Sequence, residues 1–422
     1  MRIAVIGAGI AGLTAAWLLD EEHRVTVHEA ADRVGGNIHT VPVKGAGDGA
    51  LPVDLGAQLL SPTAYPCHTA LRRALGLAAD HTLNVPMTAT FARAGRATPT
   101  LVTDDSPADE ATGRTPVSGP AAATFATLLA DVARLDAENG PVTTTVAELA
   151  ATLPPDEVRG TFLAWCASLV GCTLDQAAEV PARALAVWTT GASPEHPDAA
   201  PVWHLLATGL GEIATRIAAS LHTAVRVGTP AHSIEIRDGR PHLHDATGTT
   251  DYDAIVVATP APQAHDLLRR CPDLRSPATH LASYEYVPTT VVLHRDPVHM
   301  PPDPAHWSTT CVTVDEPWAE STVWLGPVLG TDVFKSWVTH RNEPQDVIAR
   351  AEYRQLRPTV AGSLATHALG AHQGRHGVYF AGSHLATADS QEGAVRSAID
   401  AVRPLISTAG RYALLTAGAA RH

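Results

Sequence analysis

Glycines and one acid near the start of the chain have the spacing of a dinucleotide-binding turn. Gly7, Gly9 and Gly12 form GxGxxG directly after the apolar run 3–6, and Glu29 follows 22 residues after Gly7. In such a turn the first glycine allows a tight bend, the second lets the backbone approach a pyrophosphate and the third lets a helix pack closely. The acid hydrogen-bonds a ribose hydroxyl, so Glu29 disfavours a 2′-phosphate. We therefore expect a dinucleotide site.

The elements that must position this motif are two strands and the helix between them. Residues 3–6 and 24–28 are apolar enough for short parallel strands, and residues 13–19 for a helix whose N-terminal amides face the phosphates. Near the C-terminus, residues 378–381 indicate another strand, followed by a helix that begins at about Glu392. The N-terminal amides of that helix would stabilise negative charge on a cofactor ring.

Composition excludes several classes of protein. The 422 residues carry a formal net charge of −13, which disfavours nucleic-acid and anionic-membrane partners. No apolar run is long enough to predict a membrane span. The five cysteines form no CxxC, which favours a reduced, cytoplasmic protein without a zinc site. His242 and His244 alternate on one predicted strand, but no third ligand has matching spacing, so we expect no metal.

Four segments together resemble the flavin-containing amine oxidase and phytoene desaturase superfamily. They are GAGIAGL (7–13), ExxxRxGG (29–36), VDLGAQxxSPT (53–63) and the C-terminal pair YFAG and EGAV (379–382 and 392–395). The resemblance covers nearly the whole chain in order and implies FAD, bound without a covalent link because the cysteine attachment motif is missing.

The resemblance also implies which residues contact FAD. Gly7, Gly9 and Gly12 would hold the pyrophosphate, Glu29 the ribose, and the backbone of Ala231 the adenine. The remaining expected contacts lie near the phosphates, the ribityl chain and the flavin: Arg33, Gly35, Gly36, Gly56, Ala57, Gln58, Gly382, Ser383, Gly393, Ala394 and Val395.

The fold class implied by the resemblance is α/β, similar to that of monoamine oxidases. A doubly wound, Rossmann-like FAD domain would be interleaved with an α+β substrate domain. The FAD domain would comprise residues 1–65, 200–268 and 370–422, and the substrate domain residues 66–199 and 269–369.

The chain departs from amine oxidases where those enzymes orient an amine. Thr289 or Thr290 occupies the place of a lysine near flavin N5, Ser390 replaces one tyrosine of an aromatic cage, and Ser383 replaces an acid. No aromatic residue within 359–370 supplies the second cage position. Simple amines are therefore disfavoured as substrates.

The sequence identifies no catalytic side chain, and three residues remain candidates. Lys335 is the nearest lysine, with a solvated strand lysine as the alternative interpretation. Tyr65 and His68 are acid–base candidates because they follow the segment that would approach the flavin. We place the substrate pocket at Ser390, Gln391 and Trp337; the tryptophan alternatively belongs to the core.

The leading hypothesis is an FAD-dependent oxidoreductase. It would take a hydride from a C–N or C–C bond of an apolar small molecule, with a specialised metabolite as the expected substrate and O₂ as a candidate acceptor. The alternative is a redox-neutral isomerase or cyclase in which FAD organises the pocket. A flavin-dependent sensor and an NAD dehydrogenase stay open, and the oligomeric state is not predicted.

Overall fold

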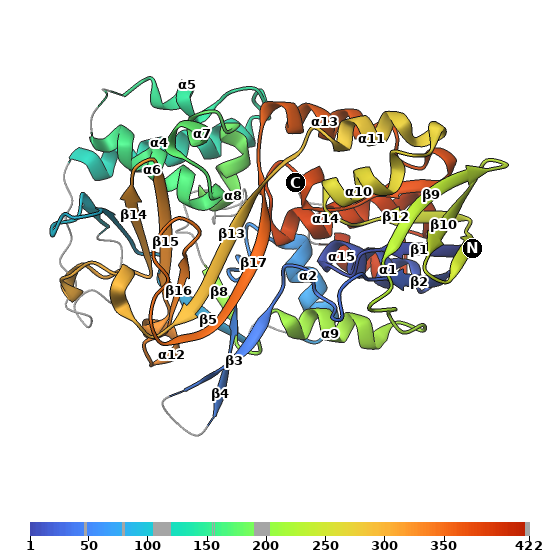
Figure 1. The fold of residues 1–422 in the computed structure, drawn as a ribbon, viewed down its shortest axis with the longest axis horizontal. Helices are drawn as coiled ribbons and strands as arrows, with labels where there is room; N and C mark the ends of the chain where they lie inside the picture. Colours follow the sequence, from blue (N-terminus) through green and yellow to red (C-terminus); the bar gives the residue numbers. More distant parts are fainter. Residues whose placement is uncertain are drawn as a thin grey trace.

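Two groups of elements make up the molecule, and two long strands lie between them (Figure 1). The computed structural model describes residues 1–45, 49–77, 81–103, 120–153, 155, 157–189 and 203–417. The long strands are β13 (Glu285–His294) and β17 (Val347–Arg357), which pair antiparallel along most of their length. Among the helices of these described residues, none combines the length and apolar character that crossing a bilayer requires.

A four-stranded parallel sheet carries the predicted dinucleotide motif. Its order is β18-β12-β1-β2, from Val378–Phe380, Ala254–Val257, Arg2–Ile6 and Arg24–His28. β12 and β18 are buried at every position and β1 at all but Arg2, as expected for short apolar runs inside an α/β domain. Helix α1 (Ile10–Leu19) is buried at every residue because it contacts the sheet, α9 (Gly211–Ser220) and α14 (Gln391–Val402).

Further elements surround this sheet. A cluster of buried apolar side chains joins the four-stranded sheet to a three-stranded sheet and three helices. These are β9 (Ala231–Arg237), β10 (Arg240–Asp245), β11 (Gly248–Asp251), α10 (Ala261–Leu268), α11 (Arg275–Leu281) and α13 (Val360–Gly370).

A seven-stranded sheet forms the other half of the molecule. Its order is β17-β13-β16-β15-β14-β6-β7, antiparallel except where β14 pairs with β6. The strands besides β13 and β17 are β6 (Ala89–Arg93), β7 (Leu101–Val102), β14 (Thr310–Asp315), β15 (Trp318–Trp324) and β16 (Phe334–Trp337). Helices cover part of it: α4 (Pro120–Ala137), α5 (Val146–Ala150), α6 (Glu157–Val170), α7 (Leu174–Ala178) and α8 (Ala186–Thr189).

Shorter elements complete the fold. Two ribbons pair β3 (Thr40–Lys44) with β4 (Ala50–Asp54), and β5 (Thr82–Val85) with β8 (Trp203–Leu206). The other helices are α2 (Pro66–Ala74), α12 (Gly326–Leu329), α15 (Gly410–Thr416) and the 3₁₀ turns Ala182–Leu185, Pro272–Leu274, Pro297–His299, Pro304–His306, Arg375–Gly377, Ser383–Leu385 and Arg403–Leu405.

The predicted α/β class with a doubly wound sheet is confirmed. The predicted domain limits stay a prediction, and parts of the ranges 66–199 and 370–422 lie outside the described residues. In the packing, α11 and α13 share a core cluster with β12 and β18 although those limits separate them.

Candidate active site

The glycine-rich turn joins β1 to α1 with one side of its backbone open. A Cβ on Gly12 would lie 1.9 Å from the carbonyl oxygen of Gly7, so only glycine permits this close approach. A Cβ on Gly9 would meet no atom within 4 Å. The Cβ position of Gly12 is therefore filled by protein, whereas that of Gly9 is open. Gly9 lies at the N-terminus of α1, where a phosphate would be stabilised.

Glu29 lies at the end of β2 beside this turn. Its carboxylate accepts hydrogen bonds from the backbone N–H of Ala8 (2.6 Å) and of Ala31 (2.8 Å). The N–H of Thr229 donates to the Glu29 carbonyl (2.8 Å), which brings the start of β9 at Ala231 to the same edge. The structure thus brings the predicted ribose and adenine positions together.

The turn 33–37 lies against the first glycine turn. Gly35 donates its N–H to the carbonyl of Ala8 (2.8 Å). The Arg33 guanidinium donates to the carbonyls of Gly36 and Ile38, both at 2.8 Å, so it fixes the turn. A cavity of about 260 Å³ adjoins this turn and is lined by Arg33, Asn37, Tyr353 and neighbouring residues.

The segment 56–58 follows β4 and packs on the same turn. A Cβ on Gly56 would lie 1.8 Å from the Asn37 carbonyl oxygen, so this contact also requires glycine. Ala57 donates its N–H to the same oxygen at 3.3 Å. The side-chain nitrogen of Gln58 is buried without a hydrogen-bond partner, as expected for a group that a ligand would satisfy.

Lys335 contacts this segment from the seven-stranded sheet. Its Nζ donates to the carbonyl oxygen of Gly56 at 2.6 Å, and the side chain is 1% exposed. The solvated-lysine interpretation is therefore wrong, because β16 is an interior strand between β13 and β15. Burial lowers the pKa of Lys335 to about 7, while the nearby Asp54 carboxylate opposes that shift.

Asp54 was not among the predicted site residues, although it belongs to the VDLG segment. Its carboxylate accepts hydrogen bonds from the Thr40 hydroxyl and, at 3.1 Å, from the N–H of Leu210. Burial raises the pKa of Asp54, which these hydrogen bonds and Lys335 oppose. Asp54 and Lys335 are thus two buried ionisable groups that influence each other's pKa beside the segment containing Gly56.

The C-terminal motif forms a strand, a turn and the buried N-terminus of α14. Gly382 donates its N–H to the Ser397 hydroxyl (2.9 Å), and Ser383 begins the following 3₁₀ turn. A Cβ on Gly393 would lie 2.6 Å from that of Ala386. Ala394 and Val395 are buried next in the same helix. The carboxyl ends of β1, β12 and β18 meet at one edge of the sheet, where ligands of such folds bind.

Ser390 and Gln391 begin α14. The Ser390 hydroxyl accepts a hydrogen bond from the N–H of Gly393 (3.0 Å), so it caps the helix. The side-chain oxygen of Gln391 is buried without a partner. Of these two residues, both predicted to line the substrate pocket, Gln391 therefore has the unused polar atom.

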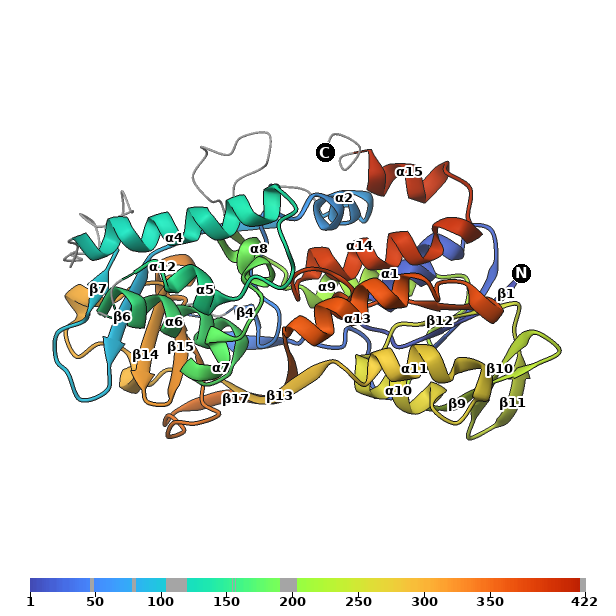
Figure 2. The same cartoon turned by 90° about the horizontal axis from the view of Figure 1, so that it is seen from above.

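Glu392, near the predicted start of the C-terminal helix, links that helix to α2. Its carboxylate accepts hydrogen bonds from the backbone N–H groups of Cys67 (3.1 Å) and His68 (2.8 Å). These amides open α2, so the carboxylate joins the N-termini of α2 and α14, which lie beside each other in Figure 2. Burial raises the pKa of Glu392, and these hydrogen bonds oppose that shift.

Tyr65 and His68 are less suited to acid–base chemistry than predicted. Tyr65 is 1% exposed, packs edge-on against Trp203 and has a raised pKa because of burial and the nearby Glu392 and Asp389. His68 is fully buried, and burial together with Arg72 lowers its pKa to about 3. His68 is therefore neutral at physiological pH.

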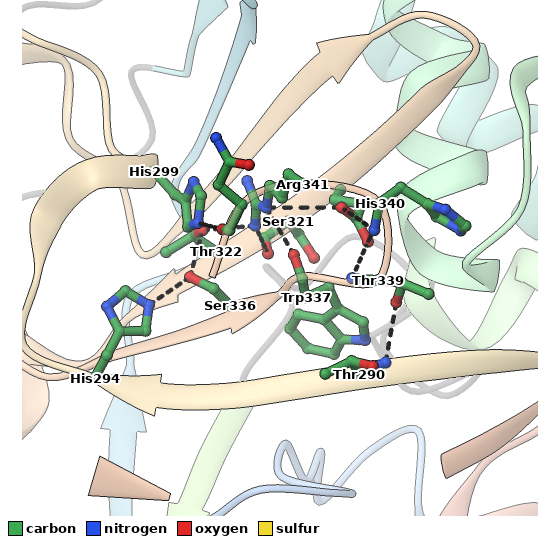
Figure 3. Close-up of polar contacts among 12 residues, drawn as sticks. Thr290, His294, His299, Ser321, Thr322, Ser336, Trp337, Thr339, His340 and Arg341 are labelled. Atoms are coloured by element: carbon green, nitrogen blue, oxygen red, sulfur yellow. Dashed lines mark hydrogen bonds and ion pairs between the residues drawn. The ribbon is translucent and has the colours of Figure 1, made fainter. Parts of the chain in front are cut away.

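Trp337 ends β16 with its ring beside Lys335, whose Nζ lies 5.1 Å from the ring centroid. A polar network holds the chain immediately after it (Figure 3). The Arg341 guanidinium donates to the carbonyls of Trp337 (2.7 Å) and Ser321 (2.6 Å) and lies 3.8 Å from the buried Glu320 carboxylate. This network fixes the end of β16 and therefore the orientation of Lys335 and Trp337.

The glycine turn, Glu29, segment 56–58 and the start of α14 supply what FAD needs from a protein. Gly9 leaves room for phosphates, Gln58 and Gln391 carry unused polar atoms, and α14 directs its N-terminus into the fold. When bound, a flavin supplies hydride transfer itself, so the protein needs mainly to bind and orient the reactants. Among the described residues, no group of three or more histidine, cysteine or acidic side chains could hold a metal ion.

Comparisons with known proteins agree with this geometry. A cyclohexylamine oxidase from Brevibacterium oxydans is 20% identical, with a TM-score of 0.69 over 96% of this chain and 98% of its own. A wild-type putrescine oxidase is 16% identical, with a TM-score of 0.68 over 96% and 99%. At these identities the likeness concerns the fold.

An L-amino-acid oxidase of Siganus canaliculatus is 51% identical over 57 residues, which are 13% of this chain and 10% of the relative. The match therefore spans about a tenth of that curated relative. The model of flavin-containing amine oxidoreductases matches residues 10–320, nearly three quarters of the chain. The chain thus belongs to the flavin-containing amine oxidoreductase family.

Proposed function

We propose that the enzyme binds FAD non-covalently along the edge formed by the glycine turn, the turn 33–37 and segment 56–58. The observation that carries this proposal is the contrast between Gly12, whose Cβ position is filled by protein, and Gly9, whose Cβ position is open. The predicted contacts of Gly382, Ser383, Gly393, Ala394 and Val395 would lie at the flavin end.

The proposed reaction removes a hydride from a C–N or C–C bond of an apolar small molecule, with O₂ as the acceptor. Family membership supports the oxidative chemistry. A specialised metabolite is favoured because Thr289 and Ser390 replace the lysine and tyrosine of amine oxidases. Lys335 and Trp337 would bound the pocket on the side of the seven-stranded sheet.

The test is anaerobic mixing of the FAD-loaded enzyme with a panel of primary amines, secondary amines and amino acids. A substrate bleaches the oxidised flavin spectrum, and admission of O₂ restores it with formation of one H₂O₂ per product. If a compound is converted to product but does not bleach the oxidised flavin spectrum, the oxidative reaction is excluded.

A redox-neutral reaction is the second candidate. A fatty acid isomerase from P. acnes has the same fold, with a TM-score of 0.68 at 14% identity over 96% of this chain. That protein shows that the fold accommodates isomerisation. Stoichiometry separates the two reactions, because an isomerase forms product without consuming an electron acceptor.

A further inference from the structure

A buried arginine on α2 has no counter-ion among the residues that the structure describes. Arg72 is 4% exposed, and its Nε and Nη1 have no hydrogen-bond partner. No carboxylate within the described part of the chain forms an ion pair with it, and the charge that acts on it is a second cation, Arg73. A desolvated guanidinium without an acceptor is unfavourable, so such groups normally have an anion beside them.

Two histidines next to Arg72 also have unused nitrogens. His68 lies one helical turn earlier on the same face of α2, is fully buried, and neither of its ring nitrogens has a partner. On β8, the Nδ1 of His204 is buried and unpartnered, and its pKa is lowered by burial and then by Arg72. The three side chains together hold several donors that lack an acceptor.

The cluster adjoins the proposed flavin site through two sets of contacts. His204 and Leu60 exchange backbone hydrogen bonds of 2.7 and 2.9 Å, and Leu60 lies four residues after Gly56. The N–H of His68 donates to Glu392 at the start of α14. The cluster therefore lies between the segment that would approach the flavin and the helix that would cap it.

We propose that Arg72, His68 and His204 bind a carboxylate of the substrate, so that the enzyme acts on a carboxylic acid with an apolar body. This inference rests on the proposed function, because the proposed function places the reactive carbon of the substrate at the flavin. Guanidinium groups bind carboxylates through two parallel hydrogen bonds, and the neutral imidazoles each supply one further N–H.

The experiment compares Arg72→Gln with Arg73→Gln, since Arg73 is the exposed neighbour on the same helix. The probes are benzoate and its neutral analogue benzamide, added to FAD-loaded protein at constant ionic strength, and the readout is the midpoint of thermal unfolding. A ligand that binds only folded protein raises this midpoint with concentration. Benzoate is expected to raise it by several degrees in the wild type and in Arg73→Gln, and to leave Arg72→Gln unchanged. Benzamide is expected to have no effect.

Equal stabilisation of Arg72→Gln and wild type by benzoate, or no stabilisation of the wild type, would overturn the proposal. If Arg72→Gln does not fold, Arg72→Lys replaces it, and we expect at least a tenfold loss of benzoate affinity relative to Arg73→Lys. Benzoate must also compete with the substrate, since non-competitive inhibition would place the anion elsewhere. The unfolding assay needs no turnover, so the two proposals can fail separately. An enzyme that oxidises neutral amines but is not stabilised by benzoate would support the proposed function and contradict this inference.

Discussion

Replacing Gly9 and Gly12 by alanine should separate cofactor binding from folding. At Gly12 the added Cβ would lie 1.9 Å from the Gly7 carbonyl oxygen, whereas contacts below 3.0 Å force a shift. Helix α1 would have to move by about 1.1 Å, the difference between those distances, although all its residues are buried. We expect Gly12→Ala to destabilise the apoprotein by about 3 kcal/mol, as overpacking does.

At Gly9 the same substitution meets no atom within 4 Å, and the backbone is extended (φ −72°, ψ 176°), which alanine adopts. Gly9 is the N-cap of α1, and alanine there should cost less than about 1 kcal/mol of apoprotein stability. The methyl group would instead occupy the space for the pyrophosphate. We expect FAD affinity to fall by about tenfold or more, equivalent to about 1.4 kcal/mol.

Urea unfolding of the apoproteins followed by circular dichroism measures the first effect, and titration with FAD followed by flavin fluorescence the second. Gly370→Ala is the control, since Gly370 also faces open space but ends α13, away from the glycine turn. Wild-type FAD affinity in Gly9→Ala, or equal loss of apoprotein stability in Gly9→Ala and Gly12→Ala, would refute the reasoning.

Three further predictions concern Lys335 and the start of α14. The pKa of Lys335 is about 7 when folded against 10.5 as reference, so the unfolded chain binds one more proton between these values and stability rises with pH. Relative to Lys335→Met, the free energy of unfolding of the wild type should rise by up to about 1.4 kcal/mol per pH unit from pH 7 to 10 in urea unfolding. Equal slopes for the two proteins would contradict the low pKa that burial gives Lys335. Ser390→Ala should cost about 1 kcal/mol by loss of the cap, measured as the urea midpoint, with Ser390→Thr retaining most of it. Glu392→Gln should lower the free energy of unfolding by about 1–3 kcal/mol, because one amide oxygen replaces two carboxylate acceptors. An unchanged urea midpoint would argue against the link between α2 and α14.

The strand–helix–strand unit at the N-terminus could be predicted because its information is local. The apolar run 3–6, the glycine spacing and Glu29 lie within one strand–helix–strand unit, and each constrains the backbone of its own neighbours. The same holds for the strand and helix around Gly382 and Gly393. The α/β fold class, which the resemblance implies, is confirmed by the sheet order.

The environment of Lys335 could not be predicted, because distant segments create it. Strands β13 and β15 cover β16 on both sides, and Gly56 supplies its hydrogen-bond acceptor from 279 residues away in the chain. A lone lysine in a short strand pattern gives no sign of such pairing. The position of Asp54 near Lys335 could not be predicted either, because it arises from the same long-range packing.

Local signals for two other residues were present but unused. Ser390 lies three residues before Gly393, the spacing of a helix N-cap, which the resemblance to a tyrosine position obscured. Tyr65, His68 and Arg72 have the spacing of one helical face, which indicates that Arg72 is directed inward. That no described acid pairs with Arg72 becomes visible only with the fold, because the sequence does not determine which acids pack against α2.

The central claim, that this edge of the sheet binds FAD non-covalently, is tested most directly by the chromophore of the purified protein. The visible absorption spectrum of the purified protein is recorded. The protein is then heat-denatured, and the released compound is identified by its mass. We predict an oxidised flavin spectrum and FAD in the supernatant, since the protein supplies binding and the cofactor the redox chemistry. A colourless protein that cannot be reconstituted with FAD, or a flavin that stays attached to the denatured chain, would contradict the claim.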